Sequence, residues 1–215
     1  MAASFVKTGS RVCDVGTDHG YLPVFLYKSG KCKSVMATEI NKKPFLNAKK
    51  TFESEKADVP LYLCDGLDLI GEKDADTVII AGMGGDVISG IISRAPWLKK
   101  SGISLILQPM TAADTLREYL ADNGFKVTRE EAVCDSGRLY SVMEAIFCGK
   151  SYKLRPAAGR IGEIKPTSED NIAYLKRQKR LCAEICNALS AVPQKAELLN
   201  GEKTALKEIN TLLGE

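Results

Sequence analysis

The residue types most able to do chemistry gather in one short segment, residues 12–23, with the sequence VCDVGTDHGYLP. Asp14, Gly16, Asp18 and Gly20 occupy alternate positions there, D-x-G-x-D-x-G, at the end of an apolar run. Glycines at a strand-to-helix turn allow a ligand to approach the backbone closely, and carboxylates attract cationic groups. The segment therefore predicts the turn of a cofactor site; a tight turn with polar caps and no ligand is the alternative.

A nicotinamide or flavin cofactor is the main rival for such a turn. Its pyrophosphate needs the spacing G-x-G-x-x-G, which is absent here, and Asp18 would repel it. Methyltransferases that use S-adenosyl-L-methionine usually carry an acidic residue followed by G-x-G-x-G, so this turn resembles theirs with Asp18 in place of the middle glycine. The amino group and sulfonium of that cofactor are cationic and tolerate nearby carboxylates.

Further candidates follow the next predicted strands. Glu39 ends the second strand nineteen residues beyond Gly20, where a carboxylate can accept both ribose hydroxyls. Asp65, followed by Gly66, is placed to accept from an adenine amino group. Each acid alone also fits a loop or helix-cap residue, but at successive strand ends they together favour an adenosyl group.

The fourth and fifth predicted strands end in AGMGGD and LQPM. Three glycines in four residues allow close backbone approach and leave N–H groups for a ligand, although a sharp turn without a ligand is the alternative. We expect cofactor contacts from Gly82 and Met83 and substrate contacts from Gly84, Gly85 and Pro109, with Gln108 in the catalytic group.

Composition excludes several other classes. His19 is the only histidine, which rules out a two-histidine metal site and makes a Ser-His-Asp hydrolase hard to build. The seven cysteines form no CxxC motif, so we expect no metal and no disulfides but buried thiols in a reducing cytosol.

No apolar stretch reaches the roughly 18 residues that are needed to span a bilayer, so a soluble cytoplasmic protein without a membrane partner is expected. The sequence leaves the oligomeric state open, with a monomer favoured.

The elements that must position these residues form an α/β pattern. Apolar, β-rich runs alternate with helical patterns, as in a parallel sheet covered on both faces. Expected strands are 11–15, 34–38, 60–64, 76–81, 103–108, 125–133 and 139–147, and expected helices are 21–28, 43–54, 85–94 and 112–123. Only residues 134–138 separate the last two strands, which predicts an antiparallel hairpin at the sheet edge. The pattern is that of a Rossmann-like, seven-stranded methyltransferase sheet, which binds ligands at the carboxyl ends of its strands.

The C-terminal part has a different character. We expect a catalytic domain over 1–150, a connector over 151–167 and a helical tail over 168–215, broken by Pro193. Narrow apolar seams predict an antiparallel coiled-coil hairpin; they consist of Tyr174, Leu181, Ile185 and Ala188 in the first helix and Leu199, Leu206, Ile209 and Leu213 in the second. Cys182 and Cys186 are expected to belong to this packing.

Charge is concentrated in the tail. Residues 150–215 carry 12 Lys and Arg against 8 Asp and Glu, while residues 1–149 carry 18 against 19. A basic appendage on a nearly neutral body suggests a polyanionic substrate, and a solvated helical surface is the alternative. The stretch that could meet phosphates contains Lys176, Arg177, Lys179 and Arg180.

Four motifs taken in order, D-x-G-[ST]-D-H-x-Y-L-P, D-G-L, I-A-G-M-G-G and L-I-L-Q-P, give a narrower resemblance that covers about residues 10–148. The chain resembles the bacterial tRNA (adenine-22-N1)-methyltransferase family. That resemblance implies methyl transfer from S-adenosyl-L-methionine to N1 of an adenosine in the D-arm of tRNA, with Asp18 as the catalytic acid/base residue. The helical tail fits the family's arrangement.

Two departures from the family pattern are visible. Met110 stands where the family commonly has Asn, so a polar contact to the target base is either lost there or must come from Gln108. The segment before the first strand has about ten residues, where the family usually has a helix near the cofactor, so an incomplete start or a more open pocket is expected.

The chemistry needs positioning more than activation, because the N1 lone pair of adenine is already free. A carboxylate that accepts from the N6 amino group would stabilise the developing cation, which suits Asp18. The target base must be unpaired or flipped, and Tyr21 could stack on it or pack in the core. A small-molecule methyltransferase, and a noncatalytic RNA- or protein-binding module with this sheet, remain the alternatives.

Overall fold

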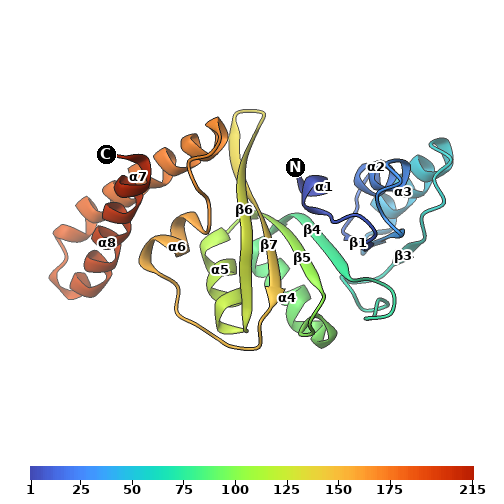
Figure 1. Ribbon diagram of the computed structural model, residues 1–215, viewed down its shortest axis with the longest axis horizontal. Helices are drawn as coiled ribbons and strands as arrows, with labels where there is room; N and C mark the ends of the chain where they lie inside the picture. Colours follow the sequence, from blue (N-terminus) through green and yellow to red (C-terminus); the bar gives the residue numbers. More distant parts are fainter.

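The computed structural model describes residues 1–215 as a seven-stranded sheet with helices on both faces and a helical tail at one end (Figure 1). The strand order is β3-β2-β1-β4-β5-β7-β6. The strands are β1 (Arg11–Val15), β2 (Ser34–Glu39), β3 (Leu61–Leu63), β4 (Thr77–Gly84), β5 (Ser104–Thr111), β6 (Phe125–Asp135) and β7 (Arg138–Phe147). The first five are parallel, whereas β7 runs antiparallel to both β5 and β6. The expected methyltransferase sheet with its edge hairpin is confirmed.

Alternating side chains of the central strands supply two separate apolar cores. Cys13 and Val78 point into the core covered by α4 and α5, while Val12 and Ile79 point into the core covered by α1, α2 and α3. This alternation is the period-2 geometry of a strand buried on both faces. The covering helices are α1 (Ala2–Phe5), α2 (Tyr21–Lys28), α3 (Lys42–Ser54), α4 (Gly85–Arg94) and α5 (Ala113–Asp122), with the short 3-10 turn η1 (Pro96–Leu98) after α4.

The carboxyl ends of β4 and β5 extend further than the sequence predicts. The expected strands end at residues 81 and 108, but Met83 pairs with Pro109 and Gly84 with Thr111. The register shifts on either side of Met83, because a bulge accommodates an extra residue without ending the ladder. The glycine-rich stretch is therefore a bulged strand rather than a sharp turn.

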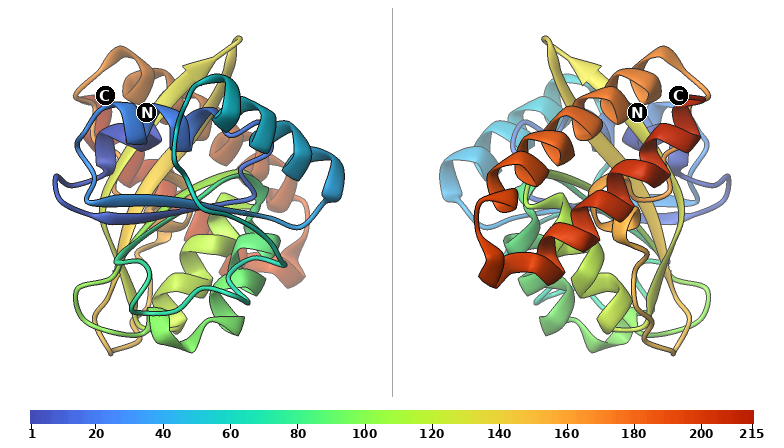
Figure 2. Two further views of the ribbon diagram at one scale, coloured as in Figure 1. Left: turned by 90° about the vertical axis from the view of Figure 1, so that its right-hand side faces the viewer. Right: turned by 90° about the vertical axis from the view of Figure 1, so that its left-hand side faces the viewer.

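The tail consists of α7 (Glu169–Ser190) and α8 (Ala196–Leu213), joined by η2 (Pro193–Lys195) and preceded by α6 (Pro156–Ile161), which the sequence did not predict. Figure 2 shows α7 and α8 side by side. The seam expected on α7 is confirmed at Tyr174, which is buried, but wrong by one position at the other three residues, since Leu181 and Ile185 are only half-buried and Ala188 is exposed. The other buried apolar residues of α7 are Leu175, Cys182, Cys186 and Leu189. On α8 the buried apolar residues are Ala205 and Ile209, and the three leucines of the expected seam are half-buried.

The seam differs because the tail also packs on the body. Its apolar core includes Ala132 of β6 and Ala157 and Ile161 of α6, so one face of α7 is already taken by the sheet hairpin. The tail is therefore a layer on the edge of the sheet, and the division of the chain at about residue 150 stays a prediction.

The cysteines only partly follow expectation. Cys13, Cys182 and Cys186 are buried, but Cys134 and Cys148 are exposed, because they lie where β6 and β7 run out into loops.

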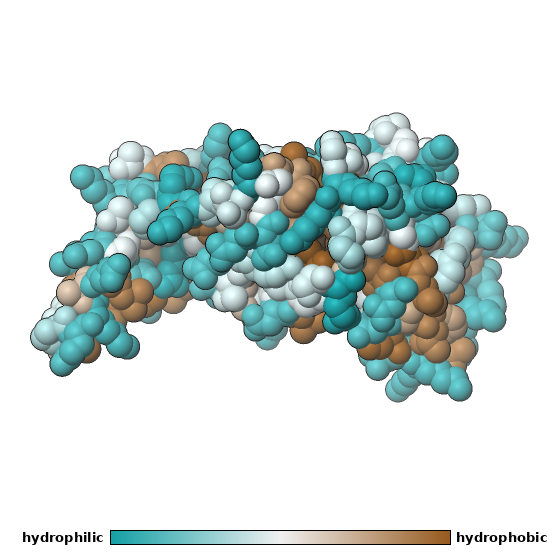
Figure 3. Space-filling view, turned by 90° about the horizontal axis from the view of Figure 1, so that it is seen from below, coloured by the Kyte–Doolittle hydropathy of each residue, from teal (hydrophilic) through white to brown (hydrophobic).

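None of the helices combines the length and apolar character needed to cross a membrane. Figure 3 shows a face that is mostly hydrophilic over the tail, with small apolar areas, and carries a larger apolar patch toward the opposite end.

Candidate active site

The turn after β1 brings its backbone against the end of β2. Gly16, Asp18 and Gly20 all have a positive φ, of 70°, 51° and 75°. This conformation costs a non-glycine residue energy, yet Asp18 adopts it where related turns place a glycine. The backbone N–H of Asp18 donates to Oε2 of Glu39 at 3.2 Å, so the buried Glu39 side chain holds the turn in place.

Two of the predicted carboxylates are buried at this edge. Glu39 accepts one backbone N–H on each oxygen, from Asp18 and from Asn41 at 2.8 Å, and a carboxylate oxygen has capacity for a second donor. Burial, with a further contribution from Glu39, raises the pKa of Asp14 to about 6. A cationic group of a ligand would favour the charged form of Asp14, as the amino group of S-adenosyl-L-methionine could.

The glycines of the turn have two different structural reasons. A Cβ on Gly16 would lie 2.1 Å from Cε of Met83, so Gly16 lets the Met83 side chain cross from β4 to the turn. A Cβ on Gly20 would lie 2.6 Å from Phe52 of α3. Helix packing thus accounts for Gly20 without a ligand, and its cofactor role stays a prediction.

Asp65 lies half-exposed beyond β3 and is paired with Arg94 of α4, whose Nη2 lies 2.7 Å from its Oδ1. The carbonyl of Gly66 accepts from the buried hydroxyl of Thr38 at 2.8 Å. Asp65 therefore lies at the expected edge of the sheet, but a new donor must share its carboxylate with Arg94.

Gln108 connects the ends of β4 and β5. Its Oε1 accepts the backbone N–H of Gly82 at 2.8 Å, and its Nε2 donates to the carbonyl of Pro109 at 3.1 Å. A Cβ on Gly82 would meet nothing within 4 Å, which leaves this backbone open to a ligand. Met110 follows and is 44% exposed.

Gly84 and Gly85 have packing reasons of their own. A Cβ on Gly85 would lie 2.2 Å from the carbonyl oxygen of Ala112, and one on Gly84 would lie 3.2 Å from Oγ1 of Thr111. Gly85 is buried. The close approach of the end of β5 and of Ala112, directly before α5, therefore explains both glycines, and their substrate contact stays a prediction.

Polar and aromatic side chains stand exposed just beyond the turn. The Asp18 carboxylate is 62% exposed and lies 3.5 Å from Nε2 of His19. The rings of His19 and Tyr21 stack with centroids 5.6 Å apart and planes 18° apart. Tyr21 is 70% exposed, so its packing in the core, the alternative left open by the sequence, is wrong.

The four basic residues of α7 differ in their surroundings. Lys179 is paired with Glu215, and Nε of Arg180 lies 3.8 Å from Glu184. Arg177 donates to the carbonyl of Leu139 on β7 at 3.1 Å. It therefore faces the sheet, while Lys176 is exposed and makes no ion pair.

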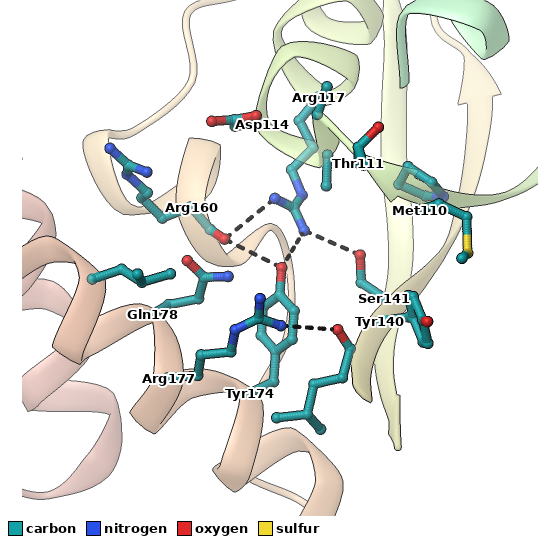
Figure 4. Close-up of a pocket in the computed structure, with 15 residues that line it drawn as sticks. Met110, Thr111, Asp114, Arg117, Tyr140, Ser141, Arg160, Tyr174, Arg177 and Gln178 are labelled. Atoms are coloured by element: carbon teal, nitrogen blue, oxygen red, sulfur yellow. Dashed lines mark hydrogen bonds between the residues drawn. The ribbon is translucent and has the colours of Figure 1, made fainter. Parts of the chain in front are cut away.

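A pocket that sequence reasoning missed lies between the end of β5 and α7 (Figure 4). Its walls come from β5, α5, β7, α6 and α7. Pro109 and Arg177, both expected to contact the substrate, line it, but the sequence did not indicate that these distant segments share one pocket. The structure has no group of three or more His, Cys, Asp or Glu that could hold a metal ion.

A sheet of this order, with carboxylates at the ends of β1 and β2 and a glycine-rich end of β4, defines a Rossmann-like methyltransferase. Residues 1–143 match the family model described as a methyltransferase domain, and the chain belongs to that family.

More particular relatives are also found. The tRNA (adenine(22)-N(1))-methyltransferase of Bacillus subtilis (strain 168) is 32% identical over 96% of this chain and 89% of its own length. The crystal structure of the B. subtilis M1A22 tRNA methyltransferase TrmK superposes with a TM-score of 0.73 at 26% identity, covering 98% of this chain and 92% of that one. Sp1610 of Streptococcus pneumoniae, solved in complex with S-adenosyl-L-methionine, gives a TM-score of 0.78 at 30% identity, covering 97% and 95%. This chain belongs to the tRNA (adenine-22-N1)-methyltransferase family.

Proposed function

We propose that this chain transfers a methyl group from S-adenosyl-L-methionine to N1 of an adenine in tRNA. The observation that carries the proposal is the exposed Asp18 carboxylate at the turn after β1, in the position where related turns have a glycine. Family membership supports the substrate, and we assign the adenine to position 22 by the names of the relatives. We expect the enzyme to act as a monomer in the cytoplasm, without a membrane partner.

The carboxylates of Asp14, Glu39 and Asp65 bind different groups of the cofactor. Glu39 has acceptor capacity left for the ribose hydroxyls. Asp14 is placed for the amino group, and Asp65, which shares its carboxylate with Arg94, for the adenine amino group. When bound, S-adenosyl-L-methionine supplies an electrophilic methyl group on a sulfonium.

The transfer requires Asp18 to face the Watson–Crick edge of the target base. As the methyl group reaches N1, the adenine ring becomes cationic, and a carboxylate beside N6 stabilises that charge. Asp18 accepts from the N6 amino group and can take a proton from it, which returns the methylated base to a neutral form. Tyr21, exposed beside Asp18, can stack on the flipped base.

The direct test is to incubate the protein with labelled S-adenosyl-L-methionine and a tRNA transcript that carries adenine at position 22. Nuclease digestion should yield 1-methyladenosine, separated from the N6 isomer by chromatography and mass spectrometry. A transcript with another base at position 22 is the control and should accept no label. Label on N6, on another base, or only on small molecules would contradict the proposal.

A further inference from the structure

The pocket between the sheet and the tail is a concave site close to the end of β5 that carries Gln108. It starts at Pro109 and Met110, directly after Gln108 on β5, and is closed on the far side by Arg177 and Gln178 of α7. Figure 4 shows Arg177 and Gln178 on the side of α7, with Met110 and Tyr140 on the opposite side of the opening. The catalytic domain and the tail thus each supply part of its wall.

Size and position separate this pocket from the cofactor site. Its volume is about 230 Å³, below the roughly 300–1,000 Å³ of sites that enclose a drug-sized ligand. None of its lining residues comes from β1, β2 or β3, the strands that carry Asp14, Glu39 and the turn to Asp65. S-adenosyl-L-methionine therefore has its place elsewhere, and a smaller group must be sought for this pocket.

Most of the charge around the pocket is already paired. Arg117 uses its guanidinium on Glu130, Ser141, Tyr174 and the carbonyls of Gly159 and Arg160. Arg160 is paired with Glu202. Arg177, by contrast, donates only to the carbonyl of Leu139 and keeps further N–H groups for a ligand.

The remaining groups suit a planar base with donors and acceptors on its edge. The Gln178 amide makes no hydrogen bond to another residue, and the exposed Asp114 carboxylate accepts only the backbone N–H of Thr115. Tyr140, Met110 and Leu181 supply apolar surface on which a base can stack or pack. An inorganic anion would gain from Arg177 but would meet the repulsion of Asp114.

We propose that this pocket receives one unpaired nucleobase of the tRNA, other than the base that is methylated. The inference rests on the proposed function. A base held between β5 and α7 fixes the RNA strand beside the catalytic edge, so the tail contributes to positioning the substrate as well as to general attraction of phosphates.

The first test removes the free charge. Arg177→Gln should raise the KM for tRNA by about tenfold, the size expected for one charge-assisted hydrogen bond, with the affinity for S-adenosyl-L-methionine unchanged. Lys203→Gln, which removes the same charge from the exposed surface of α8, is the matched control and should change KM less than twofold. Equal effects of the two variants would overturn a specific role for Arg177.

The second test fills the pocket and asks which base it holds. Gln178→Trp should slow methylation, whereas Asn187→Trp on the exposed surface of α7 should not. The base is identified with a series of transcripts, each of which lacks one base of the D-arm. At one position, loss of the base should slow methylation by the wild type as much as Gln178→Trp slows methylation of the intact transcript. Gln178→Trp should then methylate that abasic transcript no more slowly than it methylates the intact one. If the rate losses from the abasic nucleotide and from Gln178→Trp multiply at every position, the proposal is overturned. Absence of methylation by the wild type would instead contradict the proposed function itself.

Discussion

Nη2 of Arg117 on α5 lies 2.6 Å from Oε1 of Glu130 on β6, and both side chains are almost completely buried. Burial opposes the charge of Arg117, but Glu130 and Tyr174 outweigh it and raise the pKa of the guanidinium. The same guanidinium bonds α6 through the carbonyl of Gly159 and α7 through the hydroxyl of Tyr174. One buried ion pair therefore links α5 and β6 to α6 and α7.

Breaking this pair should destabilise the whole protein. Arg117→Ala leaves Glu130 buried without its partner, which typically costs about 3–5 kcal/mol, measured as the free energy of unfolding in urea. Replacing both residues, as Arg117→Met with Glu130→Leu, should recover part of that loss because no unpaired charge remains. Unchanged stability of Arg117→Ala would show that the pair is not needed.

Gly162 should be among the glycines least tolerant of substitution. Its φ is +59°, and a Cβ there would lie 1.6 Å from Oε2 of Glu130. Gly162→Ala should therefore displace Glu130 and lower the free energy of unfolding by at least the roughly 1–3 kcal/mol of a strained backbone. Gly159→Ala on α6, where a Cβ meets nothing within 4 Å, is the control and should be neutral or slightly stabilising, and similar losses from both would contradict this explanation.

Glu39 should matter for the cofactor more than for other ligands. Glu39→Gln removes the negative charge that strengthens hydrogen bonds from the ribose, each worth about 1.5–3 kcal/mol. Calorimetry should show weaker binding of S-adenosyl-L-methionine and no binding of NAD by either protein. Glu53→Gln on the exposed surface of α3 is the control, and tight NAD binding by the wild type would contradict the assigned cofactor.

Asp14 should make cofactor binding depend on pH. Its pKa of about 6 in the free protein lies above the ordinary value of 3.8, so the folded state holds the proton more tightly than the unfolded chain. Stability from this group is therefore greatest below pH 4 and is lost as pH rises through about 6. If the charged form binds the cofactor amino group, affinity should fall roughly tenfold per pH unit below pH 6.

Asp14→Asn supplies the comparison for both effects. The variant should bind S-adenosyl-L-methionine weakly with little change between pH 5 and 7.5, and its free energy of unfolding relative to wild type should rise with pH over the same range. Identical pH profiles of the two proteins would rule out the role of Asp14.

Asp18 should be required for turnover rather than for folding. Asp18→Asn retains a residue that tolerates positive φ but removes the charge beside the adenine, so single-turnover methylation should slow by about 10²–10³. Asp18→Gly relieves the backbone strain at φ 51° and should be at least as stable as wild type, yet equally slow. Cofactor affinity should survive in both, and a wild-type rate in either would contradict the mechanism.

The sequence by itself determined the sheet, the class of cofactor and the order of the motifs. Periodicity and glycine spacing are local, and five parallel strands with one edge hairpin permit few arrangements. The carboxylates at the ends of β1 and β2 and just beyond β3 were identifiable because parallel strands end at one edge. Asp18 was identifiable because it replaces a glycine, and the structure adds that it adopts a glycine conformation.

Only the tertiary structure decided how the tail is attached and which residues face one another across it. Arg117, Glu130 and Gly162 lie on three separate elements or loops, and nothing in their local sequence marks a buried pair or a glycine that makes room for it. On α7 the buried positions differ from the expected seam after Tyr174 because the sheet hairpin also packs against that helix, a contact that heptad spacing cannot report. The packing reasons for Gly20 and Gly85 likewise depend on Phe52 and Ala112, which meet those glycines only once the chain has folded.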